Sequence, residues 1–257
     1  ILMSTQYGAK QQDVLERQIS TTLLSGLVFS FFVTLSMMVL AKPVLTLIRV
    51  PEEILDSACG YLRIIFTGFL FTFAYNFFSS TLRALGDSKA SLYFLVISSV
   101  FNIAGDLLFV AVFRRGVNGS ALATVLSQMI CCLCCMIYIQ KKVPLLRLGK
   151  RWLIFDKCLL SRTFSFGITS ALQLMCVQLG KVCVQSMVNM QGIAFMAAFT
   201  AVNRVDDFAL TPQQNIAHAA TTFMAQNKGA GQEKRMKQGF FCGVLVELCY
   251  TAAVGSC

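Results

Sequence analysis

The stretch "QNKGAGQEKRMKQG" at residues 226–239 occurs in the chain in a second, related form, and this repeat indicates the class of fold. Near its beginning the chain reads "STQYGAKQQDVLERQ" (residues 4–18), and a shift of 221 positions places Gly8-Ala9 on Gly229-Ala230. In both copies an apolar run enters Gly-Ala, a short charged segment follows, and a new apolar run begins. A repeat whose copies lie so far apart in an apolar chain is typical of a duplicated transporter.

The glycines of this stretch do not match a nucleotide-binding motif. A Walker loop needs four residues between its first glycine and Gly-Lys-Ser/Thr, and a dinucleotide fingerprint needs a third glycine where Lys234 stands. We therefore interpret each copy as a tight joint between two helices, and phosphate binding is the alternative.

The composition predicts a membrane protein. Apolar residues make up 56% of the chain and charged residues only 13%, against about 25% charged in soluble domains. A stretch of about 20 apolar residues spans a bilayer as a helix. We expect an all-α polytopic membrane protein with six complete spans and a seventh cut short, and with both ends of the chain truncated. The expected spans are 18–41, 64–82, 90–113, 116–140, 163–189, 192–225 and 238 onward.

The basic residues predict the orientation. Fifteen of the 22 Lys and Arg fall in the loops on one side of the expected spans, and four fall on the other side. Cytoplasmic loops carry the excess of Lys and Arg, so both Gly-Ala copies belong in the cytoplasm. The net charge of +10 is then a sign of topology and of contact with anionic lipid, and not of nucleic-acid binding.

Three regions follow from these spans. Residues 1–140 form part of an N-terminal lobe, and residues 163–257 form part of a C-terminal lobe. Between them, residues 141–162 form a basic cytoplasmic linker that contains Pro144 and Trp152. The eleven cysteines lie almost wholly within spans and lack zinc spacing, so we expect no disulfide framework, no metal site and no cofactor.

Ionisable groups inside membrane spans are functional candidates because they are costly to place there. In the third span Asn102 and Asp106 share a helical face, and Asp106 either binds a proton or a sodium ion or is hydrogen-bonded to a neighbouring helix. The fifth span has one polar stripe, which either lines a cavity, with Lys181 available to pair with an acid, or packs against other helices through amide hydrogen bonds. This stripe contains Gln178, Lys181, Gln185 and Asn189.

The sixth expected span is the most polar. Asp207, Gln214 and His218 lie on one face, and Pro212 predicts a kink that suits a moving or cavity-lining helix. Arg204 is spaced to pair with Asp207, which leaves Asp206 on another face. The ion-coupling candidates are therefore Asp106, Asp207 and Asp206, while His218 is either a pH sensor or a hydrogen-bonded structural residue.

Several segments together resemble the multidrug and toxic compound extrusion (MATE) family of transporters. They are "STQYGAK", "YLRIIFTGFLFTFAYNFFSSTLRALGDSKASLYFLVISSVFNIAGDLLF", "GVNGSALATVLSQ" and "TTFMAQNKGAG". The resemblance implies a twelve-helix exporter with two six-helix lobes, of which this chain runs from the end of helix 2 into helix 9. The family's best-known coupling carboxylate lies on helix 1, upstream of Ile1, and helix 7 here bears Lys181 where some branches carry an acid.

The resemblance implies export of organic cations or other drugs across the plasma membrane, in exchange for protons or sodium ions. The chain shows no enzyme signature such as HExxH or GxSxG. A flippase for lipid-linked oligosaccharides is one alternative, although it would need a strongly basic cavity. A passive channel or scaffold is another, and it predicts no dependence on an ion gradient.

Overall fold

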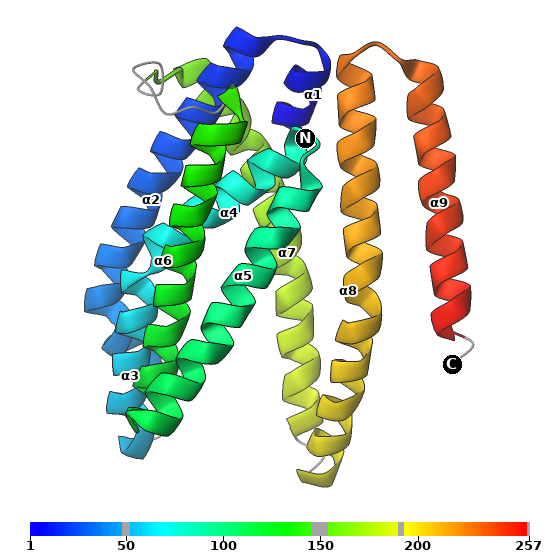
Figure 1. Cartoon of the computed structure of the whole chain (residues 1–257). Coiled ribbons are helices and arrows are strands. Elements are labelled where there is room, and N and C mark those ends of the chain that lie inside the picture. The colour runs from blue at the N-terminus through cyan, green and yellow to red at the C-terminus, as the bar shows by residue number, and fades with distance from the viewer. Residues whose placement is uncertain (48–51, 145–153, 190–192, 256–257) are drawn as a thin grey trace. The chain divides into compact units, whose positions relative to one another are not determined.

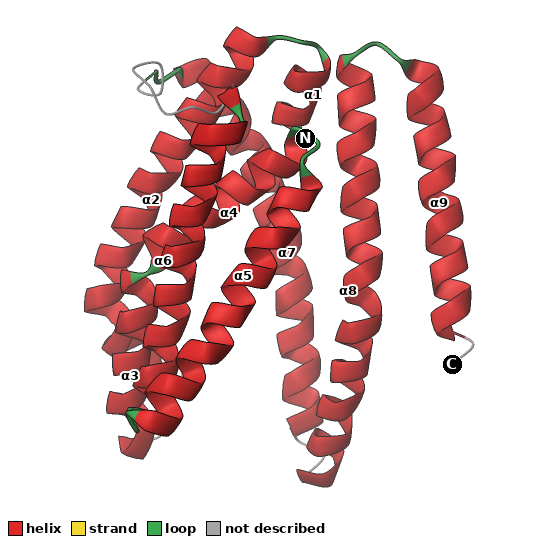
Figure 2. Ribbon diagram, viewed as in Figure 1, coloured by secondary structure: helices red, strands yellow, loops and turns green. Residues whose placement is uncertain are grey.

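The computed structural model describes residues 1–47, 52–144, 154–189 and 193–255, which form helices and connecting turns without any strand (Figure 2). This confirms the all-α prediction. The helices are α1 (Leu2–Gly8), α2 (Gln12–Leu47), α3 (Glu52–Thr67), α4 (Phe69–Ala84), α5 (Ser88–Asp106), the π-helical segment η1 (Leu107–Val112), α6 (Gly116–Lys142), α7 (Lys157–Asn189), α8 (Ile193–Gly229) and α9 (Glu233–Gly255).

The chain forms two compact units. Unit 1 consists of Ile1–Gln11 and Lys157–Cys257, and unit 2 consists of Gln12–Asp156. The short helix α1 thus belongs to the same unit as α7–α9 and packs against α8, although the next helix along the chain, α2, belongs to unit 2. The expected lobe boundaries at 140 and 163 stay a prediction, and residues 145–153 of the expected linker, Trp152 among them, lie outside the described residues.

Most helices are long and apolar enough to cross a membrane. In the described part of the chain, five pass this test alone: Gln12–Leu47, Ser88–Val112, Gly116–Lys142, Lys157–Gln185 and Glu233–Gly255. A sixth candidate is the pair α3 and α4, which are bent by 46° at the break around Gly68. The expected span 64–82 straddles this bend. The expected span 192–225 corresponds to α8, which is long enough but too polar to pass.

The bend between α3 and α4 lies against α6. A Cβ atom added at Gly68 would lie 2.5 Å from a methyl group of Val125, closer than two carbon atoms approach. Gly68 therefore lets the break between the two helices come close to α6.

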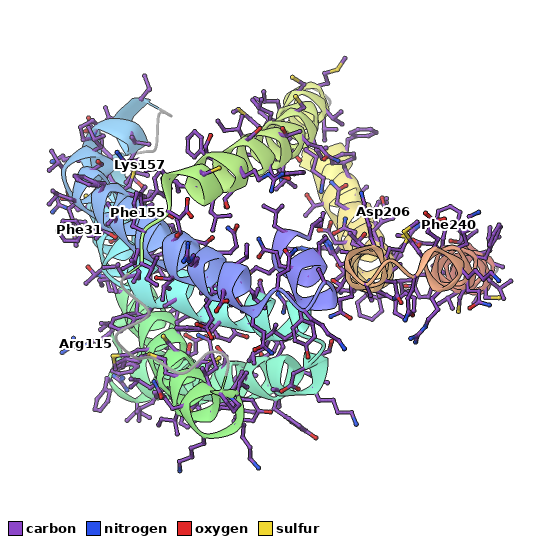
Figure 3. All side chains as sticks on the ribbon, turned by 90° about the horizontal axis from the view of Figure 1, so that it is seen from above. Phe31, Arg115, Phe155, Lys157, Asp206 and Phe240 are labelled. Atoms are coloured by element: carbon purple, nitrogen blue, oxygen red, sulfur yellow. The ribbon has the colours of Figure 1, made fainter. Side chains whose placement is uncertain are left out.

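Large apolar side chains cover the outside of both units. Phe31 on α2 is 55% exposed and Phe240 on α9 is 52% exposed, and both point away from the helix bundle (Figure 3). Soluble proteins rarely expose apolar patches of this extent. These surfaces therefore suit the acyl chains of a bilayer.

The two copies of the sequence repeat have the same turn structure. Each of the helices α1 and α8 ends in a Schellman motif, in which backbone amides beyond the helix donate to carbonyls of its last turn. In the first copy Ala9 donates to Thr5 (2.9 Å), Lys10 to Tyr7 (3.0 Å) and Gln11 to Gln6 (3.1 Å). In the second copy Ala230 donates to Gln226 (3.0 Å), Gly231 to Lys228 (3.1 Å) and Gln232 to Asn227 (2.9 Å). Lys10 and Gly231, with φ of 57° and 68°, share the left-handed conformation.

The two copies also pack against each other, because α1 lies beside the end of α8 within unit 1 (Figure 1). A Cβ atom added at Gly8 would overlap the carbonyl oxygen of Gln226. A Cβ atom added at Gly229 would overlap the carbonyl oxygen of Thr5. Thr5 and Gln226 are themselves equivalent residues of the repeat, so the contact is reciprocal. The glycines permit this close backbone approach.

Candidate functional site

Asp106 lies where the α-helix α5 changes into the π-helical segment η1. Its Oδ1 atom is buried and has no hydrogen-bond partner among the described residues. Short π-helical segments often occur at functional sites. Burying a polar atom without a hydrogen-bond partner costs free energy. The carboxyl group thus has an unused acceptor inside the helix bundle, which suits binding of a cation or a proton.

The neighbouring helix α6 comes very close to α5 at this level. A Cβ atom added at Gly105 would lie 2.9 Å from the Cβ atom of Ala123. One turn before Asp106, the Asn102 side-chain amide donates to Thr124 Oγ1 at 3.2 Å, and the Thr124 hydroxyl donates to the carbonyl of Ser120 at 3.0 Å. The predicted pair Asn102 and Asp106 therefore faces the polar side of α6.

Sequence reasoning missed the contribution of α6 to this site. The segment "GSALATVLSQ" (119–128) spaces Ser120, Thr124 and Gln128 four residues apart, which puts them on one helical face. Gln128 Oε1 is a second buried acceptor without a partner in the described part of the chain. The spacing was a usable signal, but Ser and Thr are also common packing residues between membrane helices.

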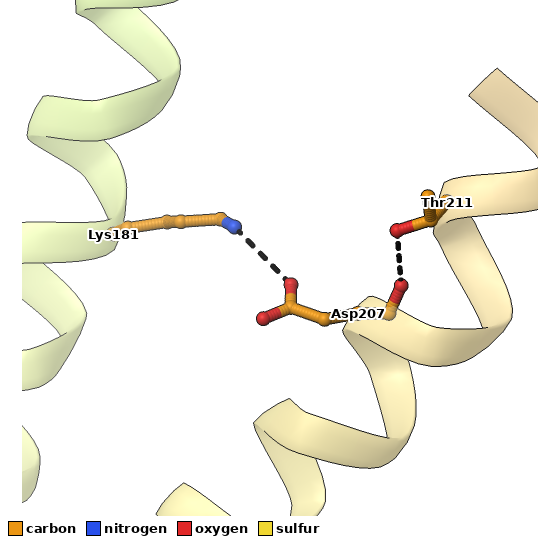
Figure 4. A network of polar contacts seen from close by, with 3 residues as sticks. All are labelled: Lys181, Asp207 and Thr211. Carbon is orange, nitrogen blue, oxygen red and sulfur yellow. Dashed lines mark hydrogen bonds and ion pairs between the residues drawn. The ribbon is translucent and has the colours of Figure 1, made fainter. Parts of the chain in front are cut away.

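The second group of predicted residues lies between α7 and α8. Lys181 Nζ and Asp207 Oδ1 are 3.8 Å apart and form an ion pair between the two helices (Figure 4). The expectation that Lys181 pairs with an acid is confirmed, and among the described residues Asp207 pairs with this lysine and not with Arg204 of its own helix. A pocket beside this pair is lined by Gly180, Lys181, Val182, Val184, Gln185, Phe199, Asn203 and Asp207.

Side chains supply hydrogen bonds to the backbone around Pro212 in α8. Proline has no N–H group, so Pro212 leaves the carbonyl of Phe208, four residues earlier, without its helical partner. In this turn the Tyr250 hydroxyl of α9 donates to the carbonyl of Ala209 at 2.9 Å, and the Thr211 hydroxyl donates to that of Asp207 at 2.5 Å. Helix α8 continues through Pro212, and the predicted role of this residue as a hinge stays a prediction.

The other predicted residues lie on the surface of unit 1. Gln178, Gln214 and His218 are exposed, and so is Asp206 on α8 (Figure 3). The structure brings none of these four into the pocket beside Lys181. Their proposed roles in lining a cavity or binding an ion therefore stay predictions.

A family model described as MatE matches residues 1–108 and 169–257. This chain belongs to the MATE family. Among curated proteins of Bacillus subtilis (strain 168), it is 32% identical to the probable multidrug resistance protein YoeA over 251 residues, and 38% identical to the probable multidrug resistance protein YpnP over 201 residues.

The MATE chain spans about half the length of these relatives. The match covers 95% of this chain and 54% of YoeA, and 77% of this chain and 44% of YpnP. Among solved structures, the crystal structure of MATE in the straight conformation superposes with a TM-score of 0.91 at 20% identity. That match covers 98% of this chain and 57% of the solved chain, so the folds agree over nearly all of the present sequence.

Proposed function

We propose that the full-length protein exports small organic molecules through the plasma membrane, and that export is driven by inward movement of protons or sodium ions. Membership of the MATE family supports transport. The buried, unpartnered Oδ1 atom of Asp106 carries the proposal of ion coupling, because it is an acid within a membrane-spanning bundle that has acceptor capacity to spare.

Asp106 is a better coupling residue than Asp207. The Lys181 ammonium lies 3.8 Å from the Asp207 carboxylate and already compensates its charge. A cation that bound Asp207 would have to displace or approach this lysine, whereas the described residues place no basic side chain in an ion pair with Asp106. Asn102, whose amide is oriented by Thr124, supplies a side-chain oxygen one turn away.

We further propose that the crossing of α1 and α8 opens and closes during transport. The turn after α1 is one of the two places where the chain passes between unit 1 and unit 2, so movement between the units acts on α1 through it. The charge bias of the sequence predicts that this turn lies at the cytoplasmic side. Alternating access requires a contact that forms in one state and breaks in the other.

The test uses the full-length gene in cells that lack their own efflux pumps. A fluorescent rhodamine methyl ester and the parent rhodamine acid are loaded, and efflux is followed while the proton and sodium gradients are collapsed separately. We expect loss of export with one of the two gradients. Export that persists without either gradient would contradict ion coupling and favour a passive channel.

Asp106→Asn is the decisive variant. It should abolish the dependence of export on the coupling ion, while Asp56→Asn is a matched control because Asp56 is exposed on α3. Unchanged gradient dependence in Asp106→Asn, at the same protein level in the membrane, would show that Asp106 is structural.

A further inference from the structure

The pocket between α7 and α8 has the size and the lining of a small-molecule site. Its volume is about 560 Å³, within the range of roughly 300–1,000 Å³ that is usual for ligand pockets. Phe199 and the valines form an apolar wall, while Lys181 and Asp207 provide one charge of each sign. Gln185 and Asn203 add side-chain amides to the lining.

The two charges are paired only loosely. Lys181 Nζ and Asp207 Oδ1 are 3.8 Å apart. A charge-assisted hydrogen bond is typically shorter, at about 2.7–2.9 Å. An ammonium group has three donors and a carboxylate has two acceptor oxygens, so both keep capacity for a ligand. The side chains are 66% and 61% exposed. Since charged groups are too costly to face lipid, this surface faces water or protein.

There is also room beside the lysine. A Cβ atom added at Gly180 would meet no atom within 4 Å, so the backbone next to Lys181 borders open space. A group that enters there reaches the ammonium and the carboxylate together, because the pair lies along the same pocket.

The pair of charges determines which ligand fits. A ligand with a single positive charge that binds Asp207 must either displace Lys181 or accept a like charge a few ångströms away. A zwitterion satisfies both residues at once, with its anionic group at Lys181 and its cationic group at Asp207. Binding of a zwitterion therefore leaves no uncompensated charge in the pocket, which is the arrangement that desolvation favours.

We propose that this pocket is a substrate site for zwitterions with an apolar body, recognised by Lys181 and Asp207. The inference rests on the proposed export function. It narrows the substrate class from small organic molecules in general to zwitterions. Lys181 selects for the anionic group of the substrate and disfavours simple cations.

The test compares two dyes that differ in one group. A rhodamine acid is zwitterionic at neutral pH, and its methyl ester is a permanent cation. Binding of each to the purified full-length protein is measured by fluorescence anisotropy. We expect the acid to bind at least about tenfold more tightly than the ester, the factor that one charge-assisted hydrogen bond supplies.

The variants then reveal the role of each charge. Lys181→Gln should weaken binding of the acid and strengthen binding of the ester, so that the preference between the two dyes reverses. Exchanging the charges with Lys181→Asp and Asp207→Lys together should restore the preference for the acid. Lys157→Gln on α7 and Glu233→Gln on α9 are controls outside the pocket, and should leave the ratio of the two affinities unchanged.

A wild-type preference for the ester, or a ratio that Lys181→Gln leaves at the wild-type value, would overturn the inference. A purely structural ion pair would change stability and not this ratio. The two proposals can fail separately. If export is driven by a gradient but Lys181→Gln leaves the ratio of the two dye affinities unchanged, only the zwitterion site is contradicted. Lack of export of either dye under any gradient removes the proposed function, and the binding ratio still decides the chemistry of the pocket.

Discussion

Gly8 of α1 and Gly229 of α8 are equivalent residues of the two repeat copies, and each lies against the backbone of the other's helix. A Cβ atom at either glycine would overlap a carbonyl oxygen. Main-chain atoms cannot rotate away as a flexible side chain can. Any side chain at these positions must therefore separate α1 from α8.

Gly8→Ala and Gly229→Ala should each weaken the α1–α8 contact by about 1–3 kcal/mol, the usual cost of inserting a methyl group into a packed contact. Backbone amides of residues 1–11 and 226–232 should exchange hydrogen faster in the purified full-length protein, and export should fall. Gly167→Ala is the control, because a Cβ atom there meets nothing within 4 Å. Equal exchange in all three variants would mean that this crossing does not hold the two helices together.

The repeat explains how much of the fold could be predicted from sequence. Gly8-Ala9 and Gly229-Ala230 marked two equivalent helix ends, and the structure shows the same turn at both. The sequence could not show that these ends contact each other, because contact between segments so far apart in the chain depends on the packing of the whole of unit 1.

The candidate site was only partly predictable for a similar reason. Helical spacing identified Asp106 and Asn102 on one face, but the π-helical segment that follows Asp106 has no sequence signature. Spacing along one helix favoured Arg204 as the partner of Asp207. The actual partner, Lys181, comes from another helix, and periodicity carries no information about which helices are neighbours.

Lys10→Gly should stabilise the protein. Lys10 has a φ of 57°, a left-handed conformation that costs a residue with a side chain about 1–2 kcal/mol, and its repeat equivalent is already a glycine. We expect a gain of roughly 1 kcal/mol, part of which is lost to the greater freedom of glycine in the unfolded chain. The reverse change, Gly231→Ala, should destabilise by a similar amount. Thermal unfolding in detergent measures both, and a gain in stability from Gly231→Ala would contradict this account.

Thr124→Val should disturb the site around Asp106 without changing a charge. Valine keeps the shape of threonine but cannot accept the hydrogen bond from Asn102, which is 3.2 Å long in the structure. The loss of one such bond costs about 1 kcal/mol, which corresponds to a several-fold weaker apparent affinity for the coupling ion. Titration of export against sodium or proton concentration measures the change. Thr163→Val is a control on α7, and an ion dependence of Thr124→Val equal to that of the control would exclude Thr124 from the site.

Tyr250→Phe should destabilise α8 at Pro212. The Tyr250 hydroxyl donates to the carbonyl of Ala209, in the turn where Pro212 removes a helical hydrogen bond, so its loss costs about 1 kcal/mol. Amides near residue 209 should then exchange faster, while Tyr93→Phe, at a tyrosine that is 66% exposed, should change little. Pro212→Ala in the Tyr250→Phe background gives the helix an amide that bonds to the carbonyl of Phe208, next to Ala209, and should recover part of the lost protection in this turn. Unchanged exchange near residue 209 in Tyr250→Phe would show that the tyrosine acts through packing between α8 and α9 and not through its hydroxyl.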